Sequence, residues 1–70
     1  MNQTVKNIII VSDYLYIEGG ASNVAVQTAV ALSKITNLNV YFFGGCGIPC
    51  QELQNSNVHI VSLGMKDLLN

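Results

Sequence analysis

The feature of this sequence best suited to chemistry is a glycine pair followed by two small residues, Gly19-Gly20-Ala21-Ser22. Glycine lacks a Cβ, so the main chain here can adopt positive φ and approach a ligand closely. If a helix begins at this point, its first N–H groups have no partners within the helix and favour an anion. We therefore predict that these four residues form a phosphate-binding loop. A structural interpretation stays open, because a glycine pair also serves as a simple turn.

The other reactive side chains form no recognisable catalytic or metal-binding set. Cys46 and Cys50 are separated by three residues, which matches neither a redox pair nor a four-ligand zinc site, so we expect two reduced structural thiols. For His59, in an apolar stretch, a partnered or solvent-facing side chain is expected in preference to a catalytic base. Asp13 either binds a ligand or holds the loop through side-chain to backbone hydrogen bonds. We assign no catalytic residue, metal ligand or cofactor.

Apolar stretches predict the three strands that would position this loop: Asn7–Ser12, Asn39–Phe43 and Val58–Ser62. The four consecutive β-branched residues at 8–11 indicate a strand covered on both faces, which is typical of a parallel sheet between helices. The alanine-rich segment from about Ala21 to Ile35 predicts a helix, with Ser22 or Asn23 as its N-cap. The segment between the second and third strands is expected to be irregular, with at most a helical turn near residues 51–54, and residues 65–70 are expected to begin a further helix.

The order strand, helix, strand, irregular segment, strand and helix predicts an α/β fold. Right-handed crossover connections would make the strands parallel, with the long helix packed on one face of the sheet. In open parallel sheets ligands bind beyond the carboxyl ends of the strands. The segments 13–20, 44–50 and 62–66 each follow a strand, so we expect the glycine loop to lie at the ligand-binding edge.

Composition indicates that the seventy residues are part of a larger protein. Only 10% of them are charged and 50% are hydrophobic, whereas ordinary soluble domains have about 25% charged residues. A chain of this size also buries only about 60% of its unfolded surface. We therefore interpret residues 1–70 as an incomplete domain, expected to be inactive and poorly soluble by itself.

Charge and hydropathy exclude some classes of partner. The net charge is −1 and the lysines are scattered, so the basic patch of a nucleic-acid binder is missing. The sequence contains neither an apolar run of spanning length nor a signal peptide. We expect a cytoplasmic protein with no transmembrane segment, and peripheral attachment to the inner face of a membrane stays open.

Several stretches together resemble a known family: Val11-Ser12-Asp13-Tyr14, Gly19-Gly20-Ala21-Ser22-Asn23-Val24-Ala25, Ala31-Leu32-Ser33-Lys34 and Phe42-Phe43-Gly44-Gly45. They look like the opening of the N-terminal half of a GT-B fold glycosyltransferase, of the kind grouped as glycosyltransferase family 4. The resemblance covers the chain from Lys6 to Met65. It departs from the family at Ile17-Glu18, where many members have a proline before the glycine pair.

The resemblance implies a three-layer Rossmann-like β-α-β-β-α fragment with a parallel sheet, the incomplete N-terminal domain (residues 1–70) of a larger two-domain protein. In that family the double-glycine loop faces the cleft between two Rossmann-like halves, near the donor diphosphate and the acceptor. The implied partners are a nucleotide-sugar donor, an unknown acceptor and the remainder of the parent chain. The implied activity is sugar transfer, as in hexosyltransferases, with retention and without a catalytic metal.

Two other classes of function are alternatives to a transferase for this sequence. A dinucleotide-binding unit is disfavoured because Gly19 to Val24 lacks the G-x-G-x-x-G spacing, and because Phe42-Phe43-Gly44 stands where an acidic residue is expected after the second strand. A non-catalytic Rossmann-like or flavodoxin-like module that binds a nucleotide or phosphate remains the alternative.

Overall fold

The structure is a computed structural model that describes residues 4–64. Its elements in chain order are β1 (Lys6–Tyr14), α1 (Gly20–Ser33), β2 (Leu38–Cys46), α2 (Gln51–Gln54) and β3 (His59–Ser62). This is the predicted alternation of strands and helices, with the short helix at residues 51–54 included. The helix predicted at residues 65–70 lies outside the described residues.

The three strands form one parallel sheet in the order β1-β2-β3, which confirms the predicted α/β class and strand direction. Ile10 lies opposite Phe42, and Phe42 lies opposite Ile60. Strand β2 continues through Gly44 and Gly45 to Cys46, although the prediction ended it at Phe43. It continues because Ser12 still pairs with Gly44 in the register.

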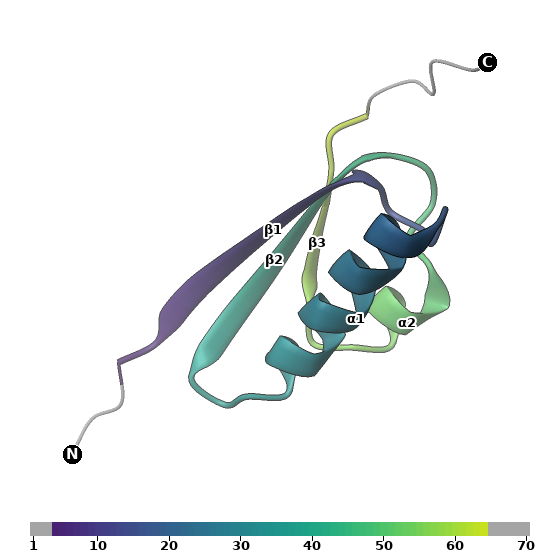
Figure 1. Cartoon of the computed structure of the whole chain (residues 1–70). Coiled ribbons are helices and arrows are strands. Elements are labelled where there is room, and N and C mark those ends of the chain that lie inside the picture. The colour runs from purple at the N-terminus through teal and green to yellow at the C-terminus, as the bar shows by residue number, and fades with distance from the viewer. Residues whose placement is uncertain (1–3, 65–70) are drawn as a thin grey trace.

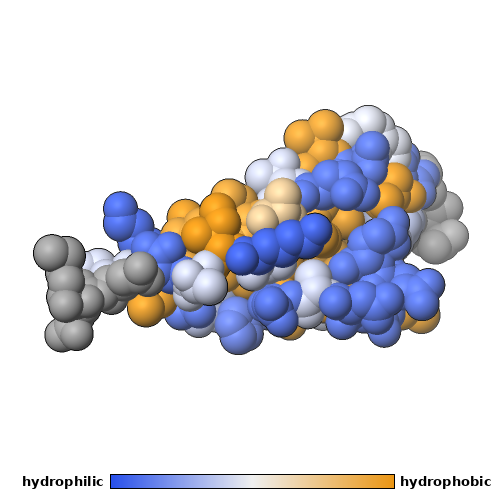
Figure 2. Space-filling view, turned by 90° about the horizontal axis from the view of Figure 1, so that it is seen from below, coloured by the Kyte–Doolittle hydropathy of each residue, from blue (hydrophilic) through white to orange (hydrophobic). Residues whose placement is uncertain are grey.

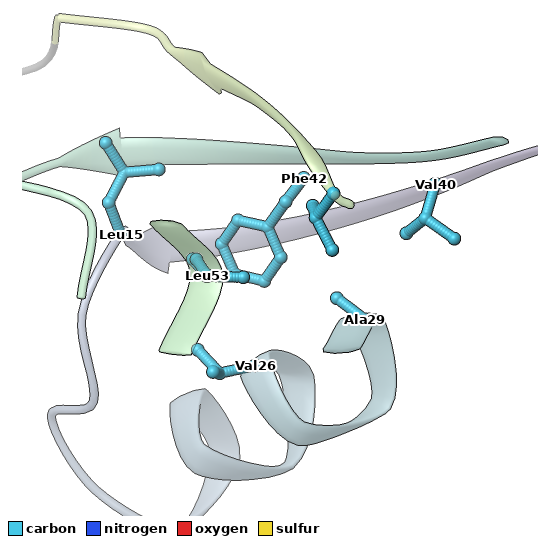
Figure 3. Close-up of a cluster of buried hydrophobic side chains, with 7 residues drawn as sticks. Leu15, Val26, Ala29, Val40, Phe42 and Leu53 are labelled. Atoms are coloured by element: carbon cyan, nitrogen blue, oxygen red, sulfur yellow. The ribbon is translucent and has the colours of Figure 1, made fainter. Parts of the chain in front are cut away.

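Both helices pack against one face of the sheet (Figure 1). The buried core lies between them and the strands and consists of Leu15, Val26, Ala29, Val40, Phe42, Leu53 and Val58. In Figure 3 the Leu53 side chain of α2 lies beside the Phe42 ring, and Val26 and Ala29 extend from α1 into the same space. The small residues of α1 allow this helix to lie close to the sheet.

The other face of the sheet has no helix over it within residues 4–64. Ile9 and Val11 of β1 point to this face and are 63% and 69% exposed. Figure 2, a view from below, shows apolar surface in orange beside polar surface in blue. The described residues therefore form two layers, a sheet and one helical layer, and the predicted cover on both faces of β1 is not found within them.

Candidate functional site

The loop between β1 and α1 is anchored at Leu15, which is fully buried. The Leu15 N–H donates to the Cys46 carbonyl at 2.9 Å, and the Leu15 carbonyl accepts from the Cys50 N–H at 2.9 Å. These two bonds attach the loop to the end of β2 and to the residue before α2. The start of the loop is thus held at the carboxyl edge of the sheet, where ligands bind in open parallel sheets.

Gly19 is the residue whose backbone conformation requires glycine in this loop. Its φ of 153° and ψ of −169° lie in a region that essentially glycine alone adopts. Gly20 has no such φ, so of the two glycines Gly19 alone uses the positive φ that the pair permits. Gly20 instead begins α1, one residue earlier than predicted.

Gly19 is also the N-cap of α1, and no side chain caps this helix. The first bond of the helix runs from the Asn23 N–H to the Gly19 carbonyl at 3.0 Å. The predicted capping role of Ser22 or Asn23 is therefore wrong, because both lie inside the helix. Without a side-chain cap, the N–H groups of Gly20 and Ala21 have no side-chain acceptor at this helix end.

Ser22 has a role that sequence reasoning missed. Its hydroxyl accepts from the Glu18 N–H at 2.6 Å and donates to the Gly19 carbonyl at 3.2 Å, and the residue is only 7% exposed. The side chain therefore ties the Glu18-Gly19 segment to the first turn of α1. A serine three residues after the N-cap glycine was the available signal, because serine hydroxyls commonly bond nearby backbone groups.

An open pocket of about 430 Å³ lies between the end of β1 and the start of α1. It is lined by Val11, Ser12, Asp13, Tyr14, Glu18, Gly19, Gly20, Ala21, Ser22 and Ala25. The fold thus brings all four predicted loop residues, Gly19 to Ser22, to one cavity. A Cβ added at Gly19 or Gly20 would meet no atom of another part of the chain within 4 Å, so both glycines border open space.

The charged side chains that line this pocket are two carboxylates, Asp13 and Glu18, and no lysine or arginine is among its lining residues. Helix N–H donors favour an anion here, while the two carboxylates oppose one. Within the described chain no hydrogen bond involves the side-chain carboxylate of Asp13. The backbone carbonyl of Asp13 accepts a hydrogen bond from the Cys46 Sγ at 3.6 Å. The Ser22 hydroxyl, and not the Asp13 side chain, holds the loop.

The remaining residues singled out in the sequence lie outside the pocket. Cys46 and Cys50 are not joined in a disulfide and lie at the anchored base of the loop. His59 stacks on the Tyr41 ring with a centroid distance of 4.8 Å, at the start of β3 on the uncovered sheet face. Between residues 4 and 64, no group of three or more histidine, cysteine or acidic side chains could hold a metal ion.

Comparisons of the chain with protein-family models, with curated proteins and with solved structures found no match. Among the residues that the structure describes, no helix is long and apolar enough to cross a membrane.

Proposed function

We propose that this chain is the N-terminal part of a glycosyltransferase that moves a sugar from a nucleotide-sugar donor to an acceptor, with retention. The observation that carries the proposal is the uncapped helix start at Gly20, which opens onto a pocket beyond the carboxyl end of a parallel strand. This arrangement supports phosphate binding by main-chain N–H groups. The proposed fold of the parent is a two-domain GT-B enzyme whose first domain is a three-layer Rossmann-like unit.

In this proposal the N–H groups of Gly20, Ala21 and Ser22 donate to oxygens of the donor diphosphate. Cleavage of the bond between sugar and diphosphate develops negative charge on the leaving phosphate. N–H groups already fixed in a helix turn stabilise that charge without reorganisation in the transition state. Gly19 gives the loop its shape, and the Ser22 hydroxyl keeps it in place through the bonds to Glu18 and Gly19.

The remainder of the parent chain has to supply what the pocket lacks. Asp13 and Glu18 give the lining a negative charge, so a bound diphosphate requires cationic groups from another part of the protein. We assign those groups, the groups that perform the transfer and most contacts to the acceptor to that remainder. The proposed protein acts in the cytoplasm or at the inner face of a membrane.

The test is a transfer assay on the full polypeptide to which these residues belong. The polypeptide is isolated at its native mass, incubated with a panel of nucleotide-sugars, and assayed by mass spectrometry for nucleoside diphosphate and glycosylated product. Sugar transfer is the expected result. Binding of a nucleotide-sugar or phosphate without turnover would replace the proposal with the non-catalytic binding module. Absence of both binding and transfer across the panel would overturn both.

A further inference from the structure

The fold brings the two cysteines of the sequence, Cys46 and Cys50, to a single residue, the fully buried Leu15. The Leu15 N–H donates to the Cys46 carbonyl and the Leu15 carbonyl accepts from the Cys50 N–H, each at 2.9 Å. In a parallel pair of strands, the N–H and the carbonyl of one residue bond to partner residues that are two positions apart. Cys46 and Cys50 take these two places although they are four positions apart in the sequence. Residues 47–49 therefore form a loop outside the pairing.

The two bonds to Leu15 bring the cysteines to a spacing that a disulfide can bridge. Two positions along a parallel strand span about 6.6 Å, and disulfides join Cα atoms that are about 4.4–6.8 Å apart. Position 46 continues the alternation of Val40 and Phe42, which are buried toward the helices, and Cys50 packs against the core on that side. Both thiols therefore lie on the helix side of the sheet.

The loop between the cysteines supports this close approach. Gly47 has a φ of 93°, a conformation that favours glycine, and a Cβ at this position would overlap the Tyr16 ring. Cys46 and Cys50 are both half-buried, so a small reagent can reach them. The Cys46 thiol donates to the Asp13 carbonyl at 3.6 Å, and thiols are weak donors whose bonds are readily replaced.

We propose that Cys46 and Cys50 form a redox-active dithiol, which a low-molecular-weight disulfide such as oxidised glutathione converts into a reversible intrachain disulfide. The thiolate of one cysteine attacks a sulfur of the reagent, whose S–S bond breaks and releases one thiolate. The thiolate of the second cysteine then attacks the mixed disulfide and releases the other half of the reagent. The cysteines lose two electrons and two protons, and the reagent becomes two thiols.

This site differs from the two structural thiols that the sequence leads one to expect. Three intervening residues match no standard redox pair, but the loop at residues 47–49 reduces the effective spacing to two positions. In reducing compartments disulfides are usually transient and redox-sensing, so the reversible form is the relevant one for a cytoplasmic protein. The inference rests on the bonds to Leu15. It is independent of the sugar chemistry proposed above, and its failure would leave that chemistry untouched.

The test is a redox titration of the full polypeptide to which these residues belong, in buffers of reduced and oxidised glutathione. After acid quenching and alkylation, trypsin releases residues 35–66 as one peptide, because Lys34 and Lys66 are the nearest cleavage sites, and this peptide contains both cysteines. Mass spectrometry distinguishes the closed disulfide, which has lost two hydrogen atoms, from glutathione adducts and alkylated thiols. The expected main oxidised form is the closed disulfide, with an equilibrium constant about tenfold or more above that of the same protein in urea.

Cys46→Ser and Cys50→Ser are matched controls, and each variant should stop at the mixed disulfide with glutathione. Two glutathione adducts or two alkylated thiols on the peptide of the unsubstituted protein would overturn the inference. An equilibrium constant no greater in the folded protein than in urea would also overturn it, because the fold would then contribute nothing to the pairing. A disulfide from either cysteine to a residue elsewhere in the parent chain would likewise contradict it.

Discussion

Gly19-Gly20 and Gly44-Gly45 are the same dipeptide, and each follows an apolar stretch in the sequence. The first pair is exposed, lies outside the sheet and has open space where a Cβ would be. The second pair is buried within β2, and a Cβ at Gly44 would overlap the Leu15 side chain. The first pair therefore leaves open space beside the pocket, and Gly44 of the second pair leaves room for the protein's own core. The surroundings of a glycine, and not the glycine itself, distinguish the two uses.

Among the glycine substitutions, the largest effect is expected from Gly44→Ala, which tests the packing role of Gly44. The added Cβ would lie over the Leu15 side chain and 3.2 Å from the Leu15 Cα, so relief requires movement of a fully buried residue. Overpacking of this kind costs about 1–3 kcal/mol or more. Thermal unfolding should therefore show a Tm lower by roughly 5–20 °C.

A double-mutant cycle shows whether Leu15 is the cause. Leu15→Ala by itself should cost about 2–5 kcal/mol, because it leaves a cavity. In the double variant the new Cβ at position 44 occupies part of that cavity, so the two losses in unfolding free energy should add to less than their sum. Strict additivity would show that the Gly44 effect arises somewhere other than the contact with Leu15.

Gly19→Ala is expected to have the next largest effect. It tests whether the backbone conformation at position 19 requires glycine. No atom would collide with the new Cβ, so any loss comes from holding alanine at a φ of 153°, which costs about 1–3 kcal/mol. Gly20→Ala is the matched control, with the same open space and an ordinary φ. Chemical denaturation should therefore show a loss of stability for Gly19→Ala and none for Gly20→Ala; equal values would remove the distinction between the two glycines.

A smaller loss is expected from Ser22→Ala, which removes the hydroxyl that connects the loop to α1. The Glu18 N–H then loses its acceptor at 2.6 Å, a change worth about 1–2 kcal/mol in unfolding free energy. Asn23→Ala is the control, because Asn23 is exposed and makes no capping bond. If Asn23→Ala proved the more destabilising of the two, the N-cap would be Asn23, as the sequence alone allowed.

The apolar pattern predicted the order of the elements along the chain and the parallel direction of the strands, and the sequence allowed at most the one helical turn found at residues 51–54. These features depend on local pattern and on handedness, both of which a sequence carries. Sequence reasoning ended β2 too early, because it interpreted Gly44 as the end of the strand. In the structure the space that a Gly44 side chain would take is occupied by Leu15, which is 29 positions earlier in the chain. The loop residues Gly19 to Ser22 were placed at the correct edge of the sheet. The two hydrogen bonds of the Ser22 hydroxyl depend on the path of the loop, which local pattern does not determine.

The smallest effect on folding, and the sharpest test of the first pair, is expected from Gly20→Val in the full polypeptide. Gly20 has an ordinary φ, no neighbour within 4 Å of its missing Cβ and a place at the first position of α1. Valine has a better intrinsic helix propensity than glycine, so the Tm should stay within a few degrees of the original. The valine methyl groups would instead project beside the N–H groups that are proposed to bind the donor diphosphate.

Loss of one charge-assisted hydrogen bond to the diphosphate would cost about 1.5–3 kcal/mol. Since about 1.4 kcal/mol corresponds to a factor of ten, kcat/KM for the donor should fall by roughly tenfold to 150-fold. Gly20→Ala adds a single methyl group, so its kcat/KM for the donor should lie between the values of the original protein and of Gly20→Val. Kinetics and thermal melts measured on the same preparations separate the two uses of a glycine pair: a role as a simple turn predicts a lower Tm with normal kinetics. Normal donor kinetics in a folded Gly20→Val variant would exclude phosphate binding at this loop, and would leave Gly19 as the one glycine of the pair with a structural requirement.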